Sequence, residues 1–418
     1  MKASARASSL ARGCVIVTAL LLAGCADAAG AGSGQPTSGA ASTAQSASRT
    51  AGTQAEGGSS SPATTSPTPC PATGPADTST AGGWLGYLAA HPGDVSVMVD
   101  DGRGARVEHR VDAPAPVASA AKVLHLAAYA EAVNMGRLSP DQPVVVGQWE
   151  AWLLPGLDGG AHGQALQAIG VANDGVQASD PAGPVRLDDV VTAMMQFSDN
   201  AAADFLRDLL GDAALIAAAG ASGSVNAIEL PSYLGAAIAL LVPADAPPPG
   251  TSRTDQAVVE LALAQRYAAD QDYRTEIRSV PAPAVDAQLE WADNSSAATT
   301  FGLAAVHRKI YDDAEDPADL GAVNARKHLE WPPAPPDTVG LGAKGGAHAG
   351  VITEAMTLRR SDGSRAAGVL LVRRMPVADW TTGLTSFAHQ ELLLGAMQDP
   401  AVLDRLSCAV GAGSTIPG

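Results

Sequence analysis

The chain has 418 residues, enough for one large or two medium-sized domains, so the size of its hydrophobic core is not limiting. Hydrophobic residues make up 46% of it and aromatic residues only 4%, which predicts a core built mainly of Ala, Val and Leu. The 43 Asp and Glu outnumber the 26 Lys and Arg and give a net charge of -17. This acidic balance argues against a nucleic-acid partner, which would require a basic face.

The N-terminus has the pattern of a targeting segment. Three basic residues within the first twelve precede the apolar run 15–22, which is much shorter than the roughly 20 residues that span a bilayer. The run ends at the tetrapeptide 22–25, which resembles the lipobox of bacterial lipoproteins. The resemblance implies a signal peptide over 1–24 and a lipid on the Cys25 thiol. The protein would then be extracytoplasmic and anchored to the cell membrane; an ordinary secretory signal with an incidental cysteine is the alternative.

Residues 25–77 are almost entirely Ala, Gly, Ser, Thr, Pro and Gln, which predicts a flexible tether. Two cysteines remain outside the signal and the lipidation site. Cys70 lies just before the predicted folded domain and Cys408 near its end, and they could form a disulfide or remain apart. Neither has a second Cys or a His at ligand spacing, so we expect no metal, and no motif indicates another cofactor.

The predicted folded domain, 78–418, opens with a short helix around 84–88 that stops at Pro92. Strands are predicted at 94–99 and 107–111, joined as a hairpin. A Pro-rich stretch then leads into a long helix that starts near Ser119 and stops at Gly136.

Helical segments dominate from there to about residue 312, with Pro- and Gly-rich breaks at 154–160 and 243–250. Two more strands are predicted at 351–359 and 366–373, followed by a final helix over about 382–397. This order predicts an α/β protein of the α+β type. Its antiparallel sheet lobe (about 78–115 and 340–410) would be flanked by the N- and C-terminal helices, with an all-helical lobe (about 116–339) inserted.

The first chemical motif is Ser119-Ala120-Ala121-Lys122 at a helix start. The spacing of three residues places the serine and the lysine on one helix face, one turn apart. A serine hydroxyl becomes a good nucleophile when a base takes its proton, and a lysine can be that base only when it is neutral. Alone, the pattern is also typical of an ordinary capped helix.

A second and a third motif follow in chain order. Ser198-Asp199-Asn200 lies at a helix junction, where it is either a plain helix cap or a proton shuttle beside a substrate-binding amide. Lys344-Gly345-Gly346 lies at the start of the late strands, as a glycine turn or as a cation lining a cleft.

Together the motifs resemble the S-x-x-K, S-D-N and K-T-G set of class A β-lactamases and related penicillin-binding proteins. The sequences at 136–146 and 187–203 resemble the same family, and the similarity extends over most of 79–405. The resemblance implies a serine hydrolase fold with an oxyanion hole formed by two backbone N–H groups. The catalytic residues that it implies are Ser119, Lys122, Ser198, Asn200 and Lys344, with Ser119 and Ala347 supplying the N–H groups.

The chain departs from that family at several places. Gly345 stands where the family has Thr or Ser, so a hydroxyl that would contact a substrate carboxylate is missing. The family's pair of Glu and, four residues on, Asn is also absent: Glu229 is the best-placed acid for activating a deacylating water, but Tyr233 occupies the partner position. Arg359 could replace the lost carboxylate contact, or be a solvated charge at a strand end. The stretch 147–165 reads as an insertion near the cleft, which could shape substrate choice or cover apolar surface.

These observations predict a monomeric cell-envelope hydrolase that transfers an acyl group through Ser119 and cleaves an amide, a β-lactam or an ester. A carboxypeptidase acting on D-alanyl wall peptides and an esterase remain open, because Gly345 and the missing Glu–Asn pair speak against efficient hydrolysis of penicillin. Gly345 and Gly346 would line the substrate site. The alternative is a catalytically weak lipoprotein that binds wall peptide or another ligand in the same cleft.

Overall fold

The computed structural model describes residues 70–224, 228–248 and 250–412. The predicted signal peptide, the lipidation site Cys25 and all of the predicted tether before residue 70 lie outside these residues. Within the described ranges, no helix has the length and apolarity to cross a membrane. Cys70 and Cys408 are both disulfide-bonded.

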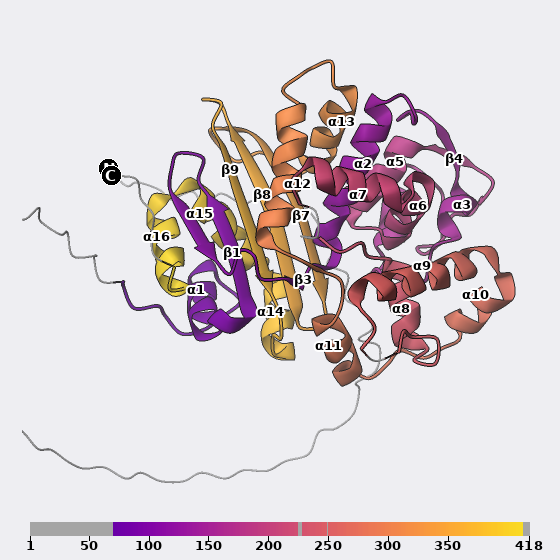
Figure 1. Ribbon diagram of the computed structural model, residues 1–418, viewed down its shortest axis with the longest axis horizontal. Coiled ribbons are helices and arrows are strands. Elements are labelled where there is room, and N and C mark those ends of the chain that lie inside the picture. The colour runs from indigo at the N-terminus through magenta and orange to yellow at the C-terminus, as the bar shows by residue number, and fades with distance from the viewer. Residues whose placement is uncertain (1–69, 225–227, 249, 413–418) are drawn as a thin grey trace, which may run out of the picture. The chain divides into compact units, whose positions relative to one another are not determined.

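A five-stranded antiparallel sheet organises the domain, with strand order β2-β1-β9-β8-β7 (Figure 1). The predicted α+β architecture, in which the first and last strands share one sheet, is therefore confirmed. β7 forms one edge of this sheet, which leaves one side of the strand open to other elements. The strands are β1 (Val95–Asp100), β2 (Arg106–His109), β7 (Thr338–His348), β8 (Val351–Arg360) and β9 (Arg365–Val372), with the short pairs β3 (Ala115–Pro116) and β6 (Ala297–Ala298), and β4 (Pro143–Val145) and β5 (Pro184–Arg186).

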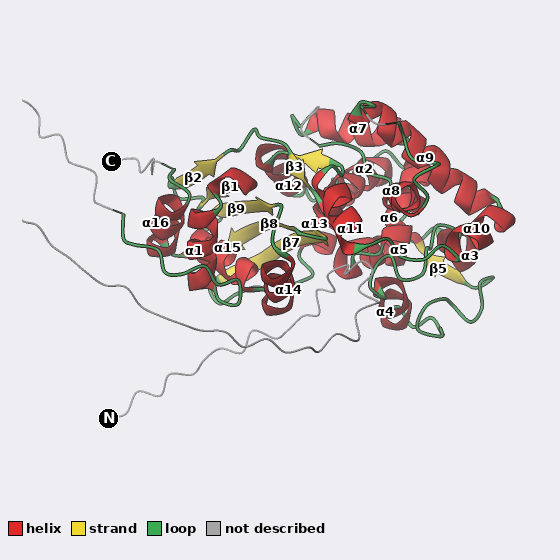
Figure 2. Ribbon diagram, turned by 90° about the horizontal axis from the view of Figure 1, so that it is seen from below, coloured by secondary structure: helices red, strands yellow, loops and turns green. Residues whose placement is uncertain are grey.

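Helices cover both faces of the sheet and build the inserted lobe (Figure 2). Several begin at a side chain that accepts a backbone N–H, as Thr80, Ser252 and Thr299 do. The helices are α1 (Ala81–Ala90), α2 (Lys122–Asn134), α3 (Val146–Glu150), α4 (Ala161–Ala168), α5 (Leu187–Thr192), α6 (Asn200–Leu210), α7 (Asp212–Ala221), α8 (Tyr233–Leu241), α9 (Arg253–Ala269), α10 (Gln271–Arg278), α11 (Val285–Asp293), α12 (Thr300–Asp313), α13 (Leu320–Leu329), α14 (Val377–Ser386), α15 (Ala388–Gln398) and α16 (Pro400–Ala409), with the 3₁₀ turns η1 (Pro92–Asp94) and η2 (Ala118–Ala121) and the π-helix η3 (Ala193–Phe197).

Two hydrophobic clusters follow from this layering. One lies between the sheet and α1, α15 and α16, and includes Trp84, Leu370 and Leu393. The other joins the opposite face of the sheet, through α12, to the buried helix α2 and the inserted lobe. Because strand side chains alternate between faces, neighbouring residues of β8 enter different clusters: Ala355 belongs to the second and Met356 to the first.

Some element predictions need correction. The final helix was predicted as one piece over 382–397, but α14, α15 and α16 are separate, and Phe387 breaks the chain between the first two with a φ of 57°. The helical region continues past residue 312 into α13. β7 lies where the second part of the sheet lobe was predicted to begin, at about residue 340, but no strand was predicted before 351. Its glycines conceal it, because glycine is depleted in strands.

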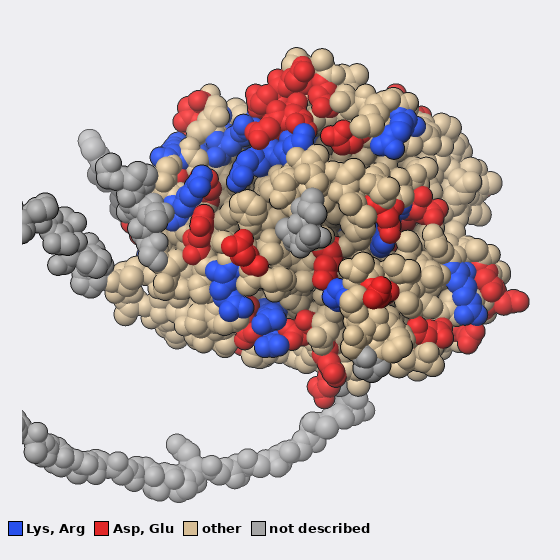
Figure 3. Space-filling view, in the orientation of Figure 1, with Lys and Arg blue, Asp and Glu red and all other residues tan. Residues whose placement is uncertain are grey.

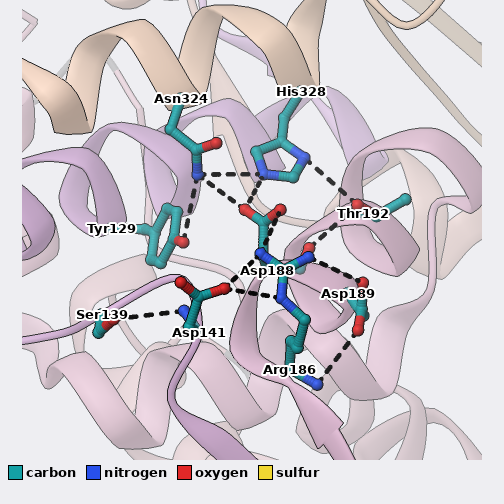
Figure 4. A network of polar contacts seen from close by, with 9 residues as sticks. All are labelled: Tyr129, Ser139, Asp141, Arg186, Asp188, Asp189, Thr192, Asn324 and His328. Carbon is teal, nitrogen blue, oxygen red and sulfur yellow. Dashed lines mark hydrogen bonds and ion pairs between the residues drawn. The ribbon is translucent and has the colours of Figure 1, made fainter.

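A polar network ties α13 to the segment that leads into the second motif (Figure 4). The Asp188 carboxylate, at the start of α5, accepts hydrogen bonds from His328 Nε2 and from Asn324 Nδ2, each at 2.7 Å. Arg186 lies 3.6 Å from the same carboxylate and also binds Asp141. Burial raises the pKa of Asp188, but the hydrogen bonds from His328 and Asn324 outweigh it and hold the pKa well below its usual range.

We expect Asp188→Ala to lower the free energy of unfolding by about 3 kcal/mol at neutral pH, because it leaves buried donors without an acceptor. Asp141→Ala is the matched control: its side chain is 82% exposed, and its ion pair with Arg186 contributes less than about 1 kcal/mol. Because the pKa of Asp188 is depressed by folding, the difference between wild type and Asp188→Ala should shrink as the pH falls below about 4. Urea unfolding measures both effects, and equal losses in the two variants would contradict this role of Asp188.

Acidic and basic side chains are intermixed on the face seen in Figure 3. Acidic residues gather at the end of α12, where Arg365 pairs with Asp312 at 2.7 Å and lies 3.9 Å from Glu315. Basic side chains on this face therefore lie next to acidic ones, as the contacts of Arg365 illustrate.

Candidate active site

Ser119 lies in the tight turn η2, directly before α2, and is almost fully buried. Ala118 before it has a φ of 47°, in the left-handed region that non-glycine residues rarely adopt and that is often found at functional sites. The edge strand β7 presses against this turn, since a Cβ placed on Gly346 would lie 2.4 Å from Ser119 N and 2.9 Å from Ala120 N. Only glycine fits here, and it lets the backbone of β7 approach the serine.

Lys122, the first residue of α2, is fully buried and contacts the other motif residues. Its Nζ lies 2.9 Å from Ser119 Oγ and donates to the Ser198 carbonyl oxygen and to Asn200 Oδ1, each at 2.6 Å. A neutral amine has two N–H groups and one lone pair. When the two N–H groups are held by Ser198 and Asn200, the lone pair is directed to the hydroxyl of Ser119.

Ser198 joins the two lysines of the site. It adopts a left-handed conformation with a φ of 66°, and its Oγ lies 3.4 Å from Lys122 Nζ and 3.0 Å from Lys344 Nζ. Asp199 caps α6 by accepting the N–H of Ala202, so Asn200 begins that helix with its amide directed at Lys122. A proton can pass between the lysines through the Ser198 hydroxyl.

The electrostatics of the site favour a neutral Lys122. Burial, and then the neighbouring Lys344 cation, hold the pKa of Lys122 well below the usual range for lysine. Burial also lowers the pKa of Lys344 to about 8, against an opposing effect of Glu354. A fraction of Lys122 can therefore act as a proton acceptor near neutral pH.

The stretch 147–165 contacts the second motif through a buried histidine. His162, in α4, is buried, and its Nδ1 lies 2.7 Å from Asp199 Oδ2, while its Nε2 lies 3.3 Å from Glu150 Oε1. Burial lowers the pKa of His162, but Asp199, Glu150 and Asp158 outweigh it and raise the pKa to about 10. His162 is thus a cation that fixes Asp199, and through it the start of α6.

A pH-dependent stability should follow from this cluster. Because folding raises the pKa of His162 from 6.5 to about 10, its contribution is complete below pH 6.5 and is lost as the pH rises through about 10. We expect His162→Gln to lower the free energy of unfolding by roughly 2–4 kcal/mol at pH 6 and by much less at pH 10. His109→Gln, whose ring contacts only the Pro92 carbonyl oxygen among its hydrogen-bond partners, should follow the wild-type pH profile in urea unfolding. A His162→Gln deficit that stays constant with pH would show that the ring is not charged.

A pocket opens beside the motif residues around Lys122, where η2, α6, α8, α11 and the end of β7 meet. Ala118, Asn200, Tyr233, Trp291 and His348 line it, together with Leu157 from the 147–165 stretch. The Tyr233 ring lies 4.4 Å from Lys122 Nζ, and His348 packs edge-on against Trp291 with ring centroids 4.7 Å apart. In the sequence, Tyr233 is apparent only as a departure from a family pattern. The place of His348 beside the pocket could not be predicted, because the residue lies in no recognisable motif.

Two predicted site residues lie elsewhere. Glu229 Oε2 accepts hydrogen bonds from Arg253 Nε at 3.2 Å and from the Ala297 N–H at 2.8 Å, and Glu229 does not line the pocket. The structure thus does not bring it together with Ser119, because the ion pair holds its carboxylate at the β6 connection.

The suggestion that Arg359 anchors a substrate carboxylate is corrected. Arg359 pairs in register with Gly340, five residues along β7 from Gly345, which corresponds to about 16 Å of strand. Its guanidinium is also occupied, since Nε and Nη2 donate to the two Glu330 carboxylate oxygens at 3.0 and 2.9 Å. The alternative interpretation, a charge near the end of a strand, therefore describes Arg359 better.

The edge strand of the antiparallel sheet carries Lys344 beside Ser119 and Lys122, which is the arrangement that the resemblance to β-lactamase-like serine hydrolases implied. Residues 85–280 match the family described as the beta-lactamase enzyme family. Over these residues the chain is similar to this family, and its antiparallel sheet with an inserted helical lobe is the fold that the resemblance of its motifs implied. No curated protein matches the chain.

Solved structures with a similar course of the chain include a β-lactamase from Sphaerobacter thermophilus, at 15% identity and a TM-score of 0.47, covering 75% of this chain and 96% of that chain. A β-lactamase from Chitinophaga pinensis has 14% identity and a TM-score of 0.47, with 75% and 98% covered. The structure of PBP-A has 13% identity and a TM-score of 0.42, with 74% and 95% covered.

Proposed function

We propose that this protein is a cell-envelope serine hydrolase that forms an acyl-enzyme on Ser119 and hydrolyses an amide, a β-lactam or an ester. The observation that carries the proposal is the buried Lys122 Nζ, 2.9 Å from Ser119 Oγ, with two hydrogen-bond acceptors holding its N–H groups. This arrangement makes Lys122 the general base and Ser119 the nucleophile.

In the acylation step, Ser119 Oγ attacks the substrate carbonyl carbon while its proton passes to Lys122 Nζ. The tetrahedral intermediate collapses, the bond to the leaving group breaks, and the leaving group takes the proton from Lys122 through the Ser198 hydroxyl. The contacts of Ser198 with Lys122 and Lys344 support this relay. Water then hydrolyses the acyl-enzyme and restores the Ser119 hydroxyl.

The backbone N–H groups of Ser119 and Ala347 are the proposed oxyanion hole. Support comes from the close approach of β7 to η2 at Gly346, which brings the backbone next to Ala347 alongside Ser119. Such preorganised donors stabilise the charge that develops on the carbonyl oxygen, typically by about 3 kcal/mol for one donor.

The proposed setting is the outer side of the cell membrane, with the protein a monomer held by a lipid on Cys25 and separated from the membrane by the segment 25–77. The lipobox-like sequence and the composition of that segment support this part of the proposal. Metabolic labelling of the full chain with an alkyne-bearing fatty acid tests it. Wild type should incorporate the label and Cys25→Ala should not, and equal labelling would contradict the anchor.

Incubation of the purified folded domain with a penicillin and, separately, with an activated ester distinguishes the remaining activities. Turnover of either probe supports a hydrolase for that class of bond, and a stable adduct without turnover supports a penicillin-binding or peptidase-like role. The alternative function is ligand binding without catalysis in the same cleft, and Gly345, which lacks the family's hydroxyl, favours it. If neither probe gives an adduct or turnover, the hydrolase proposal is wrong and the ligand-binding function takes its place.

A further inference from the structure

Two pockets of the structure share one wall, and Leu157 stands in that wall. Leu157 lines the pocket beside Lys122 and also lines a second pocket, between α8 and α10. Ala236 and Ala237 are consecutive residues of α8, and they line the first and the second pocket respectively. The two pockets therefore lie side by side, separated by Leu157 and α8.

The pocket beside Lys122 lies on the acyl side of the proposed reaction. Ala118 and His348 line it, and each is the chain neighbour of a residue of the proposed oxyanion hole. The two residues that serve the leaving group, Ser198 and Lys344, are not among the described residues that line it. It is therefore an acyl pocket, because the half of the substrate that enters it is the acyl half.

The acyl pocket favours an uncharged acyl group. Tyr233 and Trp291 contribute aromatic surface to its lining. Burial lowers the pKa of His348 to about 4, so this ring is uncharged at pH 7. Surfaces of this kind bind apolar groups through the hydrophobic effect.

The second pocket offers apolar surface beyond Leu157. Its lining is mainly aliphatic and comes from the 147–165 stretch, α8 and α10, with Leu154, Leu240, Leu241 and Ile277 among its residues. Arg278 also lines it, but the guanidinium donates to Tyr267 Oη at 2.8 Å and to the Leu153 carbonyl oxygen at 3.1 Å. An alkyl chain that passed Leu157 would therefore bury its methylene groups there.

The backbone fixes Leu157 in the shared wall. The residue is 6% exposed, and its N–H donates to the Leu154 carbonyl oxygen at 3.1 Å. The next residue, Asp158, is buried and accepts the N–H groups of Gly160 at 3.0 Å and of His162 at 2.8 Å, at the start of α4. The same stretch that contacts the second motif thus sets the position of the Leu157 side chain.

We propose that Leu157 is a specificity-determining residue, which closes the acyl pocket and restricts the enzyme to substrates with a short, uncharged acyl group. The inference rests on the proposed function, since it names the substrate class of the same site. A longer acyl chain meets the Leu157 side chain, whereas a smaller residue would join the two pockets and let the chain continue between α8 and α10. The stretch 147–165 then shapes substrate choice.

Two esters that differ only in the acyl group test this inference: the butanoyl and the octanoyl ester of 3-hydroxybenzamide. We expect wild type to hydrolyse the butanoyl ester with a kcat/KM roughly ten-fold or more above that of the octanoyl ester. Leu157→Ala should bring the ratio to about one or below, chiefly by raising kcat/KM for the octanoyl ester. Leu153→Ala is the matched control and should keep the wild-type ratio, because Leu153 is buried in the same stretch but is not among the described residues that line either pocket.

A double variant tests where the longer chain lies. Ala282 lines the second pocket from an exposed position, so Ala282→Trp can fill that pocket without displacing core side chains. Added to Leu157→Ala, it should return the ratio towards that of wild type. Leu157→Val keeps the test decisive if Leu157→Ala does not fold, and it should shift the ratio less but in the same direction.

The possible outcomes separate the inference from the proposed function. A wild-type ratio near one, a ratio unchanged by both Leu157 variants, or a gain that survives Ala282→Trp would overturn the inference while leaving the hydrolase intact. Hydrolysis of neither ester by wild type, with no acyl adduct on Ser119, would instead overturn the proposed function and the inference with it.

Discussion

Replacing Ser119 with alanine should lower kcat/KM for an activated ester by roughly 10⁴-fold or more and should leave the fold unchanged. The reason is chemical: the alanine methyl group cannot attack a carbonyl carbon, and the remaining lysines offer no nucleophile of comparable position. The substitution removes one oxygen from a turn packed between β7 and α2, so we expect only a small change in the free energy of unfolding. Steady-state kinetics and urea unfolding on the same preparation measure both quantities.

Ser139→Ala is the matched control for this variant. Ser139 is an exposed serine at a turn, where its Oγ accepts the N–H of Asp141, and it should keep wild-type kinetics. Ester hydrolysis that survives Ser119→Ala would show that another group carries the reaction.

Replacing Lys122 with methionine should lower the rate of acylation by about 10³-fold. Methionine fills a similar volume but cannot accept the proton of Ser119, and it also loses the contacts with Ser198 and Asn200. Lys122→Arg separates the charge from the base function, because a guanidinium keeps the positive charge but does not lose its proton. We expect the arginine variant to be as slow as the methionine variant in single-turnover kinetics.

Lys309→Met controls for the loss of a lysine as such. Lys309 lies in an i,i+4 ion pair with Asp313 on α12 and should be replaceable without effect on acylation. Near-wild-type acylation by Lys122→Arg would contradict the assignment of Lys122 as base and would leave it an electrostatic role only.

Much of the fold was predictable because its signals are local. The alternating strands 94–99 and 351–359 and the helix after Ser119 are read from short windows, and their order already implies one sheet with a helical insertion. The strand β7 was not predicted, because it contains several glycines and glycine gives no strand signal. These glycines are needed for tertiary contacts: the turn at Ser119 packs against Gly346, and the Glu354 side chain packs against Gly345. Such contacts depend on residues far apart in the chain.

The candidate site shows the same division. Ser119, Lys122, Ser198, Asn200 and Lys344 could be predicted from motif order, and the structure brings their side chains together.

The roles of residues outside the motifs could not be predicted from the sequence, because these roles depend on which residues they contact in the fold. Glu229 and Arg359 had suitable chemistry, but ion pairs with Arg253 and Glu330 hold them away from the serine. His162 had no local signal at all, because its importance arises from its contact with Asp199 at the start of another helix.

The most direct test of the central claim is the mass of the proteolytic peptide that contains Ser119, taken within seconds of mixing the enzyme with phenylacetyl 3-hydroxybenzamide ester and quenching in acid. A phenylacetyl group on Ser119 in wild type, which reaches at most one group per enzyme molecule and is absent from Ser119→Ala, is the predicted result. Ester turnover with the acyl group on a different residue, or with no acyl-enzyme at any time point and undiminished turnover by Ser119→Ala, would contradict acyl transfer through this serine.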